Sequence, residues 1–205
     1  MEFFLFVSII SMRKDIILFG IQWSGKWTQA DLLMKALKNY QYFEPGNILR
    51  ALKSNDNVLG EHIKTSMDQG KMVDDAIVFW LFDIYQHLLK PGQNMLVDWF
   101  MRSLPQMNYF LYQEYMHKRG LVWIHFKLSK EKAIERIMNR AAIEWRVDDT
   151  KAAIERRLSI YEKETTPVIE YLDKVGKIIH IDADQSVEKI YQDLLVALKE
   201  LHIVE

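Results

Sequence analysis

The sequence predicts an α/β fold in which short parallel strands alternate with longer helices. The predicted strands are short, continuous apolar runs without polar alternation, which is typical of parallel strands buried on both faces. Helical stretches outnumber the strands and separate them, as in repeated strand–helix–strand units. The chain has 205 residues, which suits one compact domain with small insertions.

The first strand–helix unit is the clearest. Residues 15–20 (DIILFG) form an apolar run that ends in glycine, and residues 26–39 place Ala30, Leu33 and Leu37 on one helical face. Further strands are expected at 95–97, 121–128 and 177–181. Helices are expected near 48–52, 59–68, 73–89, 106–118, 150–175 and 187–201, with another that begins after its N-cap Ser129.

The composition narrows the class of partner. A net charge of −1 offers no broad basic surface for nucleic acid or an acidic membrane, so positive charge for an anionic substrate must be local. The absence of cysteine excludes a disulfide scaffold and a cysteine-based zinc site, and it is consistent with the cytoplasm. The six histidines show no clustered metal-ligand spacing.

The amino-terminal residues carry a separate apolar run. Residues 3–10 are too few to span a bilayer, which takes about 20 residues, and Glu2 replaces the basic start of a secretory signal. We expect residues 1–11 to be a dispensable leader or a mis-assigned start, with a single domain over 12–205 that begins near Met12. The alternative is a short helix that touches a membrane.

A phosphate-binding loop is predicted between the first strand and the first helix. Residues 20–26, Gly-Ile-Gln-Trp-Ser-Gly-Lys, fit the pattern G-x-x-x-x-G-K in the structural context that this motif requires. In such a loop the backbone N–H groups and the helix N-terminus surround a phosphate. Lys26 is therefore the candidate ligand of the outer phosphates, and Thr28 is a candidate donor to the α-phosphate.

This loop resembles the adenylate kinase loop G-x-P-G-x-G-K-G-T-Q, and further matches follow in that family's order. The family's motif is given in brackets after each matching segment of this chain. The segments are 44–50 (T-G-D-x-x-R), 69–73 (G-x-L-V), 98–102 with Pro105-Gln106 (D-G-F-P-R and P-Q), Arg136 and Arg140, 145–149 (G-R-x-D-D), 156–158 and Thr166-Pro167. The resemblance covers the chain from about Arg13 to Leu201. It implies a P-loop NTPase fold with a five-stranded parallel sheet flanked by helices. It also implies an NMP-binding segment at about 44–73 and a short lid at about 140–149, without room for a zinc knuckle.

The resemblance also implies a reaction and a set of site residues. The reaction is reversible phosphoryl transfer from ATP to AMP, giving two ADP, by a monomeric enzyme with Mg²⁺ and no zinc. The implied ATP ligands are Gly20, Trp23, Ser24, Gly25, Lys26, Trp27, Thr28, Arg136, Arg140 and Gln185. The implied AMP ligands are Gly46, Arg50, Lys71, Met72, Val73, Trp99, Arg102, Gln106, Arg146 and Arg157. The implied catalytic charges are Lys26, Arg102, Arg140, Arg146 and Arg157.

Three residue types carry this chemistry. The planar fork of arginine suits bidentate contacts with phosphate. Gln106 stands at the position where the family has its adenine-reading glutamine. An amide suits this role because it pairs with both a donor and an acceptor on the base edge. Asp98 ends a strand and is expected to order water around Mg²⁺, whereas Asp148 and Asp149 either do the same or cap a helix.

Four tryptophans depart from the family in the same way. Trp23, Trp27, Trp99 and Trp145 all stand where adenylate kinases have glycine. Translating UGA as tryptophan, in a genome that uses this codon for glycine, would produce the pattern, and it could extend to Trp80 and Trp123. The loop needs glycine for positive φ and for close approach to phosphate, and a side chain in the left-handed region costs about 1–2 kcal/mol. We therefore expect the chain as written to fold but to bind ATP poorly.

Three other functions stay open at this point. Pro45 and Met101 replace family residues near the acceptor base, and the short lid also resembles UMP/CMP kinases. If the tryptophans are genuine, a non-catalytic nucleotide-binding relative is the alternative. A membrane-associated NTPase that uses residues 3–10 is the third.

Overall fold

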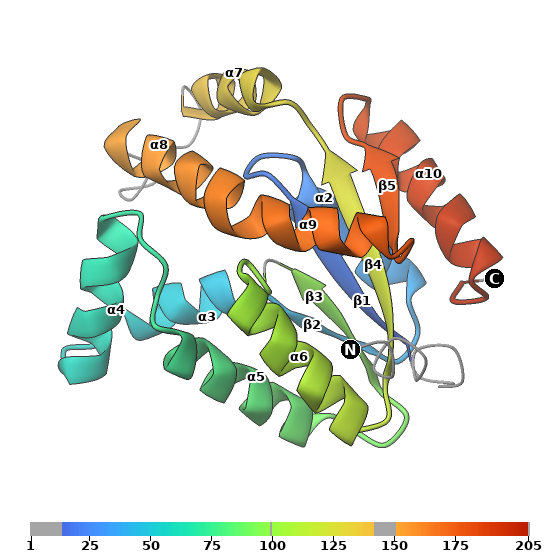
Figure 1. Ribbon diagram of the computed structural model, residues 1–205, viewed down its shortest axis with the longest axis horizontal. Helices are drawn as coiled ribbons and strands as arrows, with labels where there is room; N and C mark the ends of the chain where they lie inside the picture. Colours follow the sequence, from blue (N-terminus) through green and yellow to red (C-terminus); the bar gives the residue numbers. More distant parts are fainter. Residues whose placement is uncertain (1–13, 99, 142–150, 205) are drawn as a thin grey trace.

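Five parallel strands form one sheet in the part of the chain that the computed structural model describes, residues 14–98, 100–141 and 151–204. The strands are β1 (Lys14–Gly20), β2 (Tyr40–Phe43), β3 (Asn94–Asp98), β4 (Gly120–Lys127) and β5 (Ile178–Asp182). Their order in the sheet is β2-β3-β1-β4-β5 (Figure 1). The predicted parallel α/β sheet is confirmed, and the candidate phosphate loop leaves its central strand.

Helices cover both faces of this sheet. They are α2 (Lys26–Ala36), α3 (Pro45–Leu52), α4 (Val58–Asp68), α5 (Asp75–Leu88), α6 (Leu104–Met116), α7 (Lys130–Ala141), α8 (Lys151–Ile160), α9 (Thr166–Lys174) and α10 (Val187–Glu200), with the π-helical turn η1 (Tyr161–Thr165) between α8 and α9. From β1, Ile16 and Leu18 pack with α2 and α10, whereas Ile17 and Phe19 pack with α5, α6 and α9. Successive β1 residues thus enter opposite cores, which explains why the strand is a continuous apolar run.

Three local features differ from the sequence-based expectation. The sequence patterns predict no strand at β2, because its YQYF sequence is short, lies at the sheet edge and is only partly buried. The helix expected over 26–39 ends instead at Ala36. The expected continuous helix 150–175 is interrupted by η1, just before Pro167. Proline has no N–H to donate to the preceding turn, and a π-helical turn is one way to accommodate that loss.

The expected start of the helix after β4 is confirmed. The backbone N–H of Lys132 donates to Ser129 Oγ at 3.2 Å, which makes Ser129 the N-cap of α7. Among the described residues, no helix is both long and apolar enough to cross a membrane. The apolar run 3–10 lies outside the described residues.

A buried ionic network ties the amino-terminal ends of three strands together. Arg119 Nε donates to Asp15 Oδ2 at 2.6 Å, and the backbone N–H of Met95 donates to Asp15 Oδ1 at 2.6 Å. Glu114 Oε2 lies 3.7 Å from Arg119 Nε. Burial raises the pKa of Asp15, and burial beside Asp15 raises the pKa of Glu114 well above its usual range. One arginine therefore serves two carboxyl groups.

Candidate active site

A cavity of about 630 Å³ lies beside the carboxyl ends of β1 and β3. It is lined by the loop after β1, by α3, by the segment that leads into α5 and by side chains from α6, α7 and α8. The predicted site residues that line it are Trp23, Gly25, Lys26, Trp27, Thr28, Gly46, Arg50, Lys71, Met72, Val73, Asp98, Arg102, Gln106, Arg136 and Arg157. Residues from distant parts of the sequence thus meet at the edge of the sheet where α/β proteins bind ligands.

The other predicted site residues are placed differently. Gly20 and Ser24 belong to the loop but do not line the cavity. Gln185 Nε2 donates to the Asp182 carbonyl and to Asp193 Oδ2, both at 3.1 Å, outside the cavity lining. Trp99, Trp145, Arg146, Asp148 and Asp149 lie outside the described residues, and the side chain of Arg140 is likewise not described.

The phosphate loop folds around its own lysine. Lys26 Nζ donates to the carbonyls of Gly20 at 2.7 Å and Ile21 at 3.0 Å, and to Ser24 Oγ at 3.3 Å. Gly25 has φ 87° at the N-cap of α2, a conformation that favours glycine. Burial lowers the pKa of Lys26 to about 8, although the nearby Asp98 carboxylate opposes this shift. The lysine therefore stays mainly charged at neutral pH, directly beside a helix N-terminus.

The described tryptophans fall into two groups. Trp23 has φ 63° in the left-handed region, and Trp27 is 64% exposed; both line the cavity. Trp123, in contrast, is buried and stacks on Phe19 with ring centroids 5.9 Å apart, and Trp80 is exposed on α5. Steric interference with a phosphate ligand is therefore expected from Trp23 and Trp27, and not from Trp80 or Trp123.

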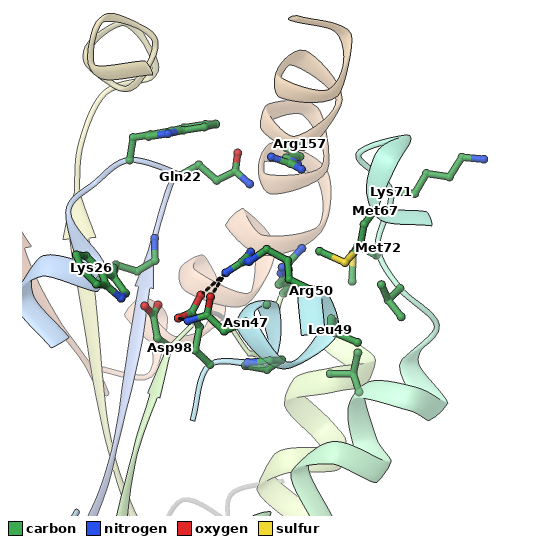
Figure 2. A pocket seen from close by; sticks show the side chains of 18 of the residues that line it. Gln22, Lys26, Asn47, Leu49, Arg50, Met67, Lys71, Met72, Asp98 and Arg157 are labelled. Atoms are coloured by element: carbon green, nitrogen blue, oxygen red, sulfur yellow. Dashed lines mark hydrogen bonds and ion pairs between the residues drawn. The ribbon is translucent and has the colours of Figure 1, made fainter. Parts of the chain in front are cut away.

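The cavity carries an excess of positive charge. Its cationic residues are Lys26, Arg50, Lys71, Arg102, Arg136 and Arg157, against the two acidic residues Glu44 and Asp98. Burial lowers the pKa of Arg102 to about 10, with a further contribution from Arg157. Figure 2 shows Lys26, Arg50 and Arg157 around the cavity, whereas Lys71 extends away from it. Such a cluster suits a ligand with several phosphate groups.

Two acidic residues and a tyrosine face this cluster. Tyr42 Oη donates to Asp98 Oδ2 at 3.0 Å and lies 3.3 Å from Glu44 Oε2, while Glu44 Oε1 accepts from Arg50 Nη2 at 3.0 Å. Burial raises the pKa of Asp98 to about 6, and Lys26 opposes the shift. Sequence reasoning missed Tyr42 and Glu44, although Glu44 opens a segment that it had selected.

Asp98 has the chemistry that the expected magnesium requires. Its Oδ1 atom is buried, with no hydrogen-bond partner among the described residues. A carboxylate oxygen in this state fits an acceptor for the water molecules that Mg²⁺ retains. Within the described parts of the chain, no group of three or more histidine or acidic residues is arranged to ligate a metal directly.

Arg102 is held through its backbone. Its N–H donates to Gln106 Oε1 at 2.8 Å, and its carbonyl accepts from Thr165 Oγ1 at 2.9 Å. Thr165 belongs to η1, so the π-helical turn positions an arginine of the cavity. Sequence reasoning missed Thr165, because only its neighbour Pro167 gives a local signal of irregular helix.

Replacing Thr165 by valine is expected to weaken binding of AMP, the acceptor that the motif resemblance implies, about fivefold to tenfold. Valine keeps the shape of threonine but leaves the partly buried Arg102 carbonyl without this donor, a loss of roughly 1 kcal/mol. Calorimetric titration with AMP measures the effect. Thr165→Ser retains the hydroxyl and is the control; equal AMP affinities for the serine and valine variants would contradict the positioning role.

The parallel sheet, the glycine–lysine loop and the cationic cavity together are those of a P-loop NTPase fold. The sequence model of the family described as "Adenylate kinase" matches residues 18–177. An adenylate kinase from Prochlorococcus marinus (strain MIT 9301) is 31% identical over 185 residues, covering 89% of this chain and 97% of the relative. One from Corynebacterium urealyticum is 32% identical over 186 residues, with 89% and 98% covered, and one from Bacteroides fragilis is 27% identical over 190 residues, with 91% and 99% covered.

The chain belongs to the adenylate kinase family, and it is accordingly a nucleoside-monophosphate kinase. The resemblance inferred from the sequence motifs is thereby confirmed. Nothing in the comparisons favours a UMP/CMP kinase or a non-catalytic relative.

Proposed function

We propose that this chain transfers the terminal phosphoryl group of ATP reversibly to AMP, giving two ADP. The observation that carries the proposal is one shared cavity in which Lys26 of the phosphate loop faces Arg50, Arg102 and Gln106 of the acceptor side. Two nucleotides held at these two ends would present their phosphates to one another. Positioning of this kind, with charge stabilisation, supplies most of the catalysis in phosphoryl transfer.

Each charged residue has a role in this reaction. Lys26, the loop N–H groups and Thr28 bind the phosphates of ATP, with Arg136 and Arg140 beside them. Arg50 and Arg102 hold the phosphate of AMP. Arg146 and Arg157 neutralise the group in flight, as an AMP phosphate oxygen forms its bond to the γ-phosphorus while the bond to the β–γ bridging oxygen breaks. Mg²⁺, when bound with ATP, neutralises phosphate charge, and Asp98 would hold its water shell.

The remaining assignments are also proposals. The NMP-binding segment, about 44–73, contains α3 and α4, which project beside the sheet (Figure 1). Residues of about 140–149 would form the short lid that excludes water, since an open site would hydrolyse ATP. We further propose that Gln185 contacts ATP and that the enzyme acts as a monomer in the cytoplasm.

Lys26→Met tests the proposed function directly. The variant is expected to lower AMP phosphorylation at least about 100-fold, because the residue supplies preorganised charge to the transferred group. The assay follows ADP formation from ATP and AMP in a glycine-restored chain, in which Trp23, Trp27, Trp99 and Trp145 are replaced by glycine. Lys35→Met is the matched control on the same helix, since Lys35 pairs only with the exposed Asp31 in the described structure. Unchanged turnover in Lys26→Met, with a folded protein, would overturn the proposal.

A further inference from the structure

The amide of Gln106 is fixed in one orientation. Gln106 is 3% exposed and lines the cavity. Its Oε1 accepts from the Arg102 backbone N–H at 2.8 Å, and its Nε2 donates to Asp75 Oδ1 at 2.6 Å. A flipped amide would point Oε1 at a carboxylate and Nε2 at an N–H group. Two acceptors would then face each other, and so would two donors. Both partners therefore favour the same orientation of the Gln106 amide.

This orientation determines which base edge the amide can read. After its two protein contacts, Gln106 retains one N–H donor on Nε2 and one lone pair on Oε1. Adenine presents an amino donor next to a ring-nitrogen acceptor, which complements that pair. A 6-oxo purine such as hypoxanthine presents a carbonyl acceptor next to an N–H donor, and only the flipped amide would complement it.

We propose that Asp75 is a positioning residue that makes the acceptor site select a 6-amino purine over a 6-oxo purine. The inference rests on the proposed function, since it assumes that Gln106 reads the acceptor base. Asp75 acts through Gln106: its carboxylate accepts one Nε2 hydrogen and, together with the Arg102 backbone N–H, fixes the polarity of the amide. Asp75 is not needed as the cap of α5, because Asp74 already accepts from the Ala76 N–H at 2.8 Å.

A purely structural role for Asp75 would be a link between α5 and α6. The same two helices carry a second link of this kind: Tyr109 Oη donates its hydrogen to the Asp83 carboxylate and lies 2.6 Å from both of its oxygens. Neither Asp83 nor Tyr109 lines the cavity. Asp83→Ala therefore removes a comparable link between α5 and α6 without touching the site, which makes it the matched control for Asp75→Ala.

The test is calorimetric titration of the full chain and its variants with AMP and with IMP, two nucleotides that differ in the edge that Gln106 would read. This readout does not require catalysis. The unaltered chain is expected to prefer AMP, and Asp75→Ala is expected to reduce that preference about tenfold or more. Asp75→Asn, whose amide oxygen can still accept from Nε2, is expected to keep most of it, and Asp83→Ala all of it.

The outcomes separate the inference from the function on which it rests. If the unaltered chain prefers AMP and Asp75→Ala keeps that preference, the positioning role is overturned while the proposed function stands. If Asp83→Ala reduces the preference as strongly as Asp75→Ala, the role is structural and the inference is again overturned. If the unaltered chain does not prefer AMP over IMP, the base reading by Gln106 fails, and the inference fails with it.

Discussion

A glycine-restored chain, with Trp23, Trp27, Trp99 and Trp145 replaced by glycine, is expected to bind ATP at least about tenfold more tightly than the chain as written. Trp23 holds φ 63°, where a side chain costs about 1–2 kcal/mol and glycine costs little. Trp27 stands at the first turn of α2 and lines the phosphate end of the cavity. Removing the two indoles opens that space and lets the loop backbone approach the phosphates.

Calorimetric titration with ATP measures this difference. Trp80→Gly is the control, because Trp80 is exposed on α5 and does not line the cavity; it is expected to lose some helix stability, about 1 kcal/mol, and to leave ATP affinity unchanged. Equal affinities for the written and the glycine-restored chains would contradict the crowding argument. The codons give a second test of our recoding proposal, since UGG at the four positions would rule it out.

Arg119→Met is expected to destabilise the fold by about 3–5 kcal/mol. Arg119 and Asp15 form a buried ion pair, and removal of one partner leaves an uncompensated charge in the interior. Here the arginine serves two carboxyl groups, Asp15 and Glu114, so both lose their cation. Urea unfolding measures the free energy. Lys130→Met breaks the exposed pair with Glu162 and is expected to cost less than about 1 kcal/mol.

The loss in Arg119→Met should depend on pH. Burial raises the pKa of both Asp15 and Glu114, so their protonated forms are favoured in the folded state. The stability that comes from these raised folded-state pKa values is present at acidic pH and is lost as the pH rises through them. Without the arginine these pKa values rise further, so the variant should be less destabilised at pH 5 than at pH 8. An equal loss at both pH values would contradict the account of this network.

The parts of the fold that could be predicted are those with a strong local pattern. The run DIILFG, the glycine–lysine loop and the helix from Lys26 identify the first unit without long-range information. Strand β2 could not be located, because YQYF is short and half-buried at the sheet edge. The π-helical turn was missed for a similar reason, since only Pro167 marks it locally.

The site shows the same division. Lys26, Arg102 and Gln106 stand in motifs and were therefore selected in advance, and all three line the cavity. Asp75 and Thr165 act through single hydrogen bonds to residues more than thirty positions away, and no periodicity or motif encodes such contacts. Sequence patterns therefore identify the residues that line the cavity more readily than the residues that hold them in place.

The most direct test of the account is ATP-dependent phosphorylation of AMP, with UMP and CMP in parallel, by the written and the glycine-restored chains. We predict that the glycine-restored chain turns over AMP in preference to both pyrimidine nucleotides, and that the written chain is much slower. If both chains are folded and neither phosphorylates any of the three nucleotides, the catalytic account is contradicted, and a non-catalytic nucleotide-binding role replaces it.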